Sequence, residues 1–316
     1  VRTKGNNMAI NKAMRAALSI LSYPEIDVKK TYLVERELHK LLAHRRKNPA
    51  LYRVWEYPVS NGGHQVPVRV FKPAEAVGPA VLIFFHGGGW VTGTVDSYDG
   101  VCADMAAMTG CTVASVDYRL APEHRFPAAP EDCYAAAREV FRNAGLLGVR
   151  REDLVLIGDS AGGNLAAAVS LMARDRGEFL PRRQILIYPA LAGDHSESSP
   201  YPSVRENGTG YLLTAKRVRD FLDLYRSSDD DLTNPYFAPL SADSLADQPD
   251  TLIITAQYCP LRDEGEAYGQ RLREAGGYAE THRIPDALHG YFSLPARFAL
   301  VKQTYEIINR FLERSV

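Results

Sequence analysis

The chain has 316 residues, of which 46% are hydrophobic, and its formal net charge is -1 at pH 7. This length suits one large α/β domain, alone or with a small accessory one, and the near-zero charge gives no global field that would attract nucleic acid. No apolar run of roughly 18 residues is present, so the sequence predicts no membrane span. The cysteines form no C-x-x-C pair and no metal-ligand spacing, which indicates reduced thiols in a cytoplasmic protein.

Residues 8–48 are predicted to be helical, in two helices, because Pro24 interrupts the pattern. Residues 53–71 alternate apolar and polar side chains around Asn61-Gly62-Gly63, which is typical of a β-hairpin. Further strands are expected at 81–85, 111–116, 154–157, 184–188, 251–255 and 280–284, and helices at 101–108, 131–146, 214–225 and 295–313. Because strands and helices alternate, the sequence predicts an α/β fold with a mostly parallel sheet and helices on both faces.

One segment interrupts this alternation. Residues 192–230 begin with a polar loop and continue into the helix at 214–225, with no strand of their own. Together with the helical N-terminus they form a candidate cap. The sequence thus predicts a cap segment over residues 1–50 and a core over residues 51–316, with a cap insertion around 192–230.

The most informative motif is Gly158-Asp159-Ser160-Ala161-Gly162, which matches G-x-S-x-G. It follows a short apolar strand and precedes a helix. Small residues on both sides of Ser160 permit a sharp turn that exposes the serine oxygen, and the helix N-terminus favours a developing anion. An ordinary Gly/Ser-rich turn is the alternative, but the flanking strand and helix favour a nucleophile.

A second motif, His86-Gly87-Gly88-Gly89, directly follows the apolar strand at 81–85. Consecutive glycines leave backbone N–H groups unobstructed, so these groups can point at a tetrahedral oxyanion. A merely flexible turn is the alternative. The occurrence of both motifs in one chain favours an acyl-transfer site.

Together the two motifs resemble the α/β-hydrolase fold. The segments 117–123 and 260–265 are similar to stretches of the hormone-sensitive-lipase-like esterases, the bacterial family IV, and the resemblance covers roughly residues 50–316. It implies a helical cap and hydrolysis of small, short-acyl carboxylic esters with no metal or cofactor. Relatives often form dimers, so a homodimer is a candidate assembly.

The resemblance also implies roles for individual residues. Ser160 would be the nucleophile and His289 the general base and then the acid. The expected oxyanion donors are the N–H groups of Gly88, Gly89 and Ala161, with Gly87 shaping the loop. Trp90, Asp159 and Tyr188 are expected at the substrate pocket, and Asp117, Arg119 and Glu123 in a buried polar network beneath it.

One position departs from the family pattern, because Cys259 stands where the family has its catalytic aspartate. An aspartate fixes the imidazole tautomer and stabilises the imidazolium, which a neutral thiol does poorly. Three explanations are open. Asp263, Glu264 or Asp286 substitutes for the acid; the protein is a weak enzyme; or it is a ligand-binding pseudo-hydrolase. A further alternative makes Cys259 a nucleophile or metal ligand beside His289.

Overall fold

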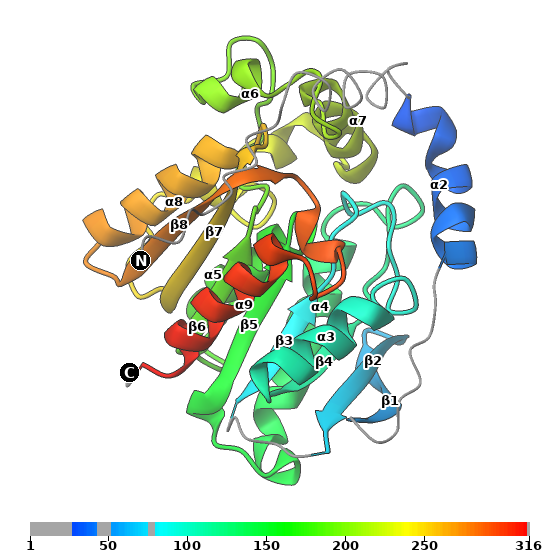
Figure 1. The fold of residues 1–316 in the computed structure, drawn as a ribbon, viewed down its shortest axis with the longest axis vertical. Coiled ribbons are helices and arrows are strands. Elements are labelled where there is room, and N and C mark those ends of the chain that lie inside the picture. The colour runs from blue at the N-terminus through cyan, green and yellow to red at the C-terminus, as the bar shows by residue number, and fades with distance from the viewer. Residues whose placement is uncertain (1–26, 43–51, 75–79, 315–316) are drawn as a thin grey trace, which may run out of the picture.

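The computed structural model describes residues 27–42, 52–74 and 80–314 (Figure 1). Within them, eight strands form one sheet in the order β1-β2-β4-β3-β5-β6-β7-β8. β2 is antiparallel to both of its neighbours, and every other neighbouring pair is parallel, which confirms the predicted mostly parallel sheet. The strands span Tyr52–Asn61 (β1), His64–Pro73 (β2), Val81–Phe85 (β3), Thr112–Val116 (β4), Leu154–Asp159 (β5), Arg183–Ile187 (β6), Asp250–Tyr258 (β7) and Ala279–Leu288 (β8).

Helices lie on both faces of this sheet, as predicted. Helices α3 and α9 contact each other over one face, while α4 and α5 contact each other over the opposite one (Figure 1). The central strands β3 and β5 are buried along their whole length, because helices cover them on both sides. The helices span Val28–Leu42 (α2), Asp99–Thr109 (α3), Ala128–Arg142 (α4), Ala161–Arg176 (α5), Pro202–Glu206 (α6), Ala215–Tyr225 (α7), Arg262–Glu274 (α8) and Ala299–Leu312 (α9).

Several boundaries differ from the sequence prediction. The helix expected over 131–146 ends at Arg142 and is followed by a separate short 3-10 turn, Ala144–Leu147. The last strand, β8, extends to Leu288. It does so because β7 continues to Tyr258, which pairs with Leu288 after a shift in the register of the two strands. In the described residues, no helix combines the length and the apolar character needed to cross a bilayer.

Of the elements predicted as a cap, α6 and α7 lie beyond the end of the sheet at which β3, β5 and β7 finish (Figure 1). Helices α6 and α7 fall between β6 and β7, and α7 contacts α2 from the N-terminal segment. The Thr214 hydroxyl caps α7 by accepting the N–H of Arg217 at 3.1 Å. The first of the two predicted N-terminal helices lies outside the described residues. The division into cap and core stays a prediction.

Two glycines allow close backbone packing at the turn between β5 and α5. A Cβ at Gly162 would lie 1.9 Å from the carbonyl oxygen of Phe85, the last residue of β3. A Cβ at Gly158 would lie 2.1 Å from the carbonyl oxygen of Gly162. Both obstacles are backbone atoms that cannot rotate away, so the strand-to-helix turn requires glycine at both positions.

We expect Gly162→Ala to lower the free energy of unfolding by about 3 kcal/mol or more, because the added methyl overlaps a backbone carbonyl of a central strand. Urea unfolding monitored by circular dichroism measures the change. Gly145→Ala is the matched control, since its Cβ would meet no atom within 4 Å. Equal stability of the two variants would contradict the steric argument.

Candidate active site

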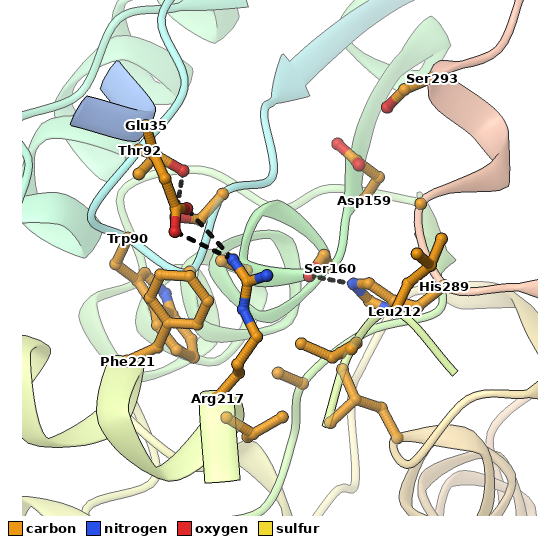
Figure 2. A pocket seen from close by; sticks show the side chains of 18 of the residues that line it. Glu35, Trp90, Thr92, Asp159, Ser160, Leu212, Arg217, Phe221, His289 and Ser293 are labelled. Atoms are coloured by element: carbon orange, nitrogen blue, oxygen red, sulfur yellow. Dashed lines mark hydrogen bonds and ion pairs between the residues drawn. The ribbon is translucent and has the colours of Figure 1, made fainter. Parts of the chain in front are cut away.

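Ser160 occupies the turn between β5 and α5. Its backbone dihedrals, φ 56° and ψ -118°, are rarely adopted by a residue other than glycine. The Ser160 N–H donates to the Ile187 carbonyl at 2.8 Å, and the Ser160 carbonyl accepts the N–H of Asn164 at 3.1 Å. The neighbouring strand and helix therefore hold the strained turn, and Ser160 lines a cavity (Figure 2).

Three of the predicted site residues contact one another in succession at this turn. The Ser160 Oγ is 2.9 Å from His289 Nε2, the contact drawn in Figure 2. The other ring nitrogen, Nδ1, is 3.2 Å from the Cys259 Sγ. His289 directly follows β8, and Cys259 directly follows β7, so the parallel pairing of these strands brings both to one end of the sheet.

Cys259 contacts His289 as a neutral thiol. Its side chain is fully buried, and this burial raises the pKa of the thiol far above its usual range. A carboxylate can only accept a hydrogen bond from Nδ1–H, which keeps Nε2 unprotonated and ready to take the serine proton. A thiol both donates and accepts, so it leaves both imidazole tautomers available.

The structure brings none of the three candidate substitute acids to His289. Asp263 accepts hydrogen bonds from the Arg262 side chain and the Ser203 N–H, at 2.7 Å each. Glu264 is buried, where it accepts the Leu191 N–H and pairs with His195 at 2.7 Å. In the described residues, no hydrogen bond links the Asp286 carboxylate to the imidazole; its backbone N–H donates to Gln257.

The environment of His289 disfavours the protonated ring. Burial lowers the pKa of His289 from 6.5 to about 3, and the positive charge of Arg217 lowers it further. The neighbouring thiol supplies no negative charge to oppose these effects. The His289 imidazole is therefore neutral across the ordinary pH range.

The glycine loop after β3 is held by Asp159. The Gly87 N–H donates to Asp159 Oδ1 at 2.8 Å, so this group is committed to the fold rather than to an oxyanion. Gly88 and Gly89 adopt φ values of 116° and 62°. Their N–H groups make no hydrogen bond with any described residue, and both residues line the cavity together with Ala161.

Asp159 and Tyr188, both expected at the substrate pocket, lie at different places relative to the cavity. Asp159 lines the cavity, but its carboxylate also accepts the hydroxyls of Tyr98 at 3.2 Å and Tyr188 at 3.3 Å. Burial raises the pKa of Asp159 to about 6. Tyr188 does not line the cavity: it is fully buried, and its ring packs against His289 with centroids 4.7 Å apart. It supports the imidazole from the side of the core.

The cavity in front of Ser160 measures about 370 Å³, at the lower end of the size of small-molecule sites. Trp90 and Phe221 form part of its wall (Figure 2). The Trp90 ring is fixed by stacking on Tyr225, with centroids 4.5 Å apart. This rigid aromatic wall limits the length of an apolar group that the cavity can hold.

Sequence reasoning missed two charged residues in this cavity. Arg217 of α7 donates from Nη2 to both carboxylate oxygens of Glu35 on α2, at 3.2 and 3.1 Å (Figure 2). Nothing local distinguishes Arg217 from other arginines of this helix. Only the docking of α2 against α7 reveals the pair.

The predicted buried network of Asp117, Arg119 and Glu123 does not exist as one unit. Asp117 accepts the Val95 N–H at 3.0 Å, and Arg119 pairs with the fully buried Asp132. Glu123 is exposed and pairs with Arg36 of α2. The three residues form no common network, because each has a different partner.

The geometry opposes Cys259 as a nucleophile. Its thiol is fully buried, does not line the cavity and contacts the ring nitrogen opposite to the one that faces Ser160. A metal site at this place also lacks ligands. No group of three or more His, Cys, Asp or Glu side chains in the described part of the chain could hold a metal ion.

We expect nuclear magnetic resonance titration to find His289 neutral down to about pH 4, and Cys259→Asp to raise its pKa because a buried carboxylate stabilises the imidazolium. In the unfolded chain this histidine binds its proton near pH 6.5, whereas in the folded protein it binds the proton only near pH 3. The free energy of unfolding therefore decreases as the pH falls from about 6.5 toward 3. Cys259→Ser is the control and should keep the low pKa. An unchanged pKa in the aspartate variant would refute this account.

The comparisons with known proteins agree with the fold. Residues 82–293 match the family described as the alpha/beta hydrolase fold. An arylesterase of Saccharolobus solfataricus is 34% identical over 263 residues, which cover 83% of this chain and 84% of the relative. The esterase LipI of Mycobacterium tuberculosis is 42% identical over 245 residues, covering 76% of this chain and 75% of LipI.

Experimentally determined structures give the same result. An esterase of Pyrobaculum calidifontis superposes with a TM-score of 0.84 and 37% sequence identity, covering 96% of this chain and 98% of that one. The chain therefore belongs to the α/β-hydrolase family, within its hormone-sensitive-lipase-like group of esterases.

Proposed function

We propose that the protein hydrolyses small, short-acyl carboxylic esters through an acyl-enzyme on Ser160. The observation that carries this proposal is the 2.9 Å contact between the Ser160 Oγ and His289 Nε2, made from a strained turn at the wall of a cavity. Nucleophile and base within hydrogen-bond reach are what covalent acyl transfer requires.

The first half-reaction uses His289 as a base. The Ser160 Oγ attacks the ester carbonyl carbon while its proton passes to His289 Nε2. The N–H groups of Gly88, Gly89 and Ala161 donate to the carbonyl oxygen as it becomes an oxyanion. The tetrahedral intermediate then collapses, the bond to the alcohol oxygen breaks, and His289 gives its proton to the departing alcohol.

The second half-reaction repeats these steps with water. His289 Nε2 takes a proton from a water molecule whose oxygen attacks the acyl carbon. The acyl–Ser160 bond breaks, the serine recovers its proton, and the carboxylic acid leaves. A cavity of about 370 Å³ walled by Trp90 and Phe221 supports a preference for short acyl chains.

Cys259 is the weak member of this proposed site. A neutral thiol provides no negative charge to stabilise the imidazolium that forms during each half-reaction. In serine proteases, loss of the acid costs on the order of 10⁴ in turnover. The protein is thus proposed to be a slow esterase whose nucleophile, base and oxyanion donors are intact.

The same cysteine favours a second candidate, a ligand-binding pseudo-hydrolase of low or no activity. Such a protein would bind a ligand in the cavity and would not need an activated serine.

A cytoplasmic location and a homodimer stay predictions from the sequence.

We expect purified protein to hydrolyse p-nitrophenyl acetate and Ser160→Ala to abolish that hydrolysis, because the acyl group then has no acceptor. A fluorophosphonate probe should label the native protein at Ser160, as read by mass spectrometry. Absence of both labelling and Ser160-dependent hydrolysis would reject the enzyme and favour the pseudo-hydrolase.

We expect Cys259→Asp to raise kcat by on the order of 10²-fold with little change in KM, because the carboxylate stabilises the imidazolium of the transition state and not the bound ester. Steady-state kinetics on p-nitrophenyl acetate measures both constants. Cys259→Ser, which keeps a neutral side chain, is the matched control and should stay near the native rate. A folded aspartate variant with unchanged kcat would disprove the assigned role of this position.

A further inference from the structure

The cavity in front of Ser160 carries one strongly polar feature on its cap side. Among the described residues that line the cavity, Arg217 is the one lysine or arginine. Part of the cavity wall is apolar, since Leu212, Leu213, Val218 and Phe221 also line it. A guanidinium in such a setting costs free energy unless its donors are satisfied.

The hydrogen bonds of Arg217 are incomplete. Both oxygens of Glu35 contact a single nitrogen, Nη2. The Arg217 Nε is buried and has no partner among the described residues. Nη1 also makes no hydrogen bond within the described part of the chain. A guanidinium has five N–H donors in a fixed plane, so donors remain for another acceptor.

The geometry indicates where that acceptor would come from. In Figure 2 the guanidinium extends from α7 into the space between Glu35 and Ser160. Arg217 and His289 line the same cavity, so the guanidinium and the imidazole border the same space. In agreement, the positive charge of Arg217 lowers the pKa of His289. An ester positioned for attack by Ser160 would fill this space and come within reach of Arg217.

The charges of the cavity limit the kind of acceptor. Glu35 already balances the charge of Arg217, and Asp159 adds a second carboxyl group to the lining. A substrate carboxylate would meet these like charges in a partly desolvated space, which is unfavourable. An uncharged ether, carbonyl or hydroxyl oxygen can accept the guanidinium hydrogen bond without that repulsion.

We propose that Arg217, oriented by Glu35, is a specificity-determining residue that selects uncharged esters with a further oxygen acceptor a few bonds from the scissile carbonyl. This inference rests on the proposed esterase function and names its substrate class. Arg217 has no part in bond breaking; it binds the substrate and orients it.

The test compares esters of equal length in which an ether oxygen replaces one methylene. The pairs are 2-methoxyethyl acetate against butyl acetate, and methyl 4-methoxybutanoate against methyl hexanoate, which probe the alcohol and acyl sides. For each pair, the ratio of kcat/KM for ether over alkyl ester is measured in native protein and in Arg217→Met. Intrinsic reactivity differences cancel when the two ratios are compared.

We expect Arg217→Met to lower this ratio about tenfold for one of the pairs, because the variant keeps the volume but loses a charged donor. Arg217→Lys should recover part of the loss. Val218→Ala, which alters the neighbouring position of the same wall, is the control for general disturbance and should leave the ratio unchanged. Equal ratios in native protein and Arg217→Met for both pairs would overturn the proposal.

Two further measurements separate the possible outcomes. Native protein should hydrolyse the anionic ester monomethyl glutarate poorly. Glu35→Gln should improve that activity several-fold, because it removes one of the like charges. A native preference for monomethyl glutarate would refute the selection of uncharged substrates. Dissociation constants of the ester pairs for Ser160→Ala, with and without Arg217→Met, test the same selectivity without turnover. If no ester is hydrolysed but the ratio of dissociation constants still depends on Arg217, the proposed esterase function fails and the proposed selectivity stands.

Discussion

The close approach of the Ser160 turn to the end of β3 is the constraint on which the site depends. Gly162 packs against the carbonyl of Phe85, and the glycine loop begins immediately after that residue. One backbone contact therefore fixes the turn and the loop relative to each other. Asp159 reinforces it, because the residue next to the serine accepts the Gly87 N–H. Through this arrangement a buried sheet places the Ser160 side chain near the Gly88 and Gly89 N–H groups, which have no hydrogen-bond partner among the described residues.

Burial sets the electrostatics of the site, because no carboxylate of the described residues hydrogen-bonds to the His289 ring. His289 is neutral because its ring is desolvated, and the Cys259 thiol is neutral for the same reason. The nearby acids are committed elsewhere: Glu264 to His195, and Asp263 to Arg262 and the Ser203 backbone. Recruiting either of them to the imidazole would break contacts that hold the segment between β6 and β7 in place.

The features that the sequence predicted correctly depend on local patterns, that is, on short runs of consecutive residues. Apolar runs predicted the strands, and the G-x-S-x-G motif indicated Ser160. The family resemblance implied His289 as its partner, and the two side chains are in contact. The missed features depend on side chains that are distant in the chain. Arg217 and Glu35 meet only because α2 docks on α7, and Glu264 finds His195 across a loop. The placement of Tyr188 behind His289 follows from core packing, which periodicity does not encode.

The neutral thiol beside His289 also changes how charge is distributed during the proposed reaction. With an aspartate, the imidazolium would have a permanent counterion on the side away from the substrate. Here the only full negative charge that arises together with it is the oxyanion of the intermediate, on the far side of Ser160. The reaction would thus create an isolated dipole across the nucleophile, and the rate would depend steeply on how well the glycine loop solvates its negative end.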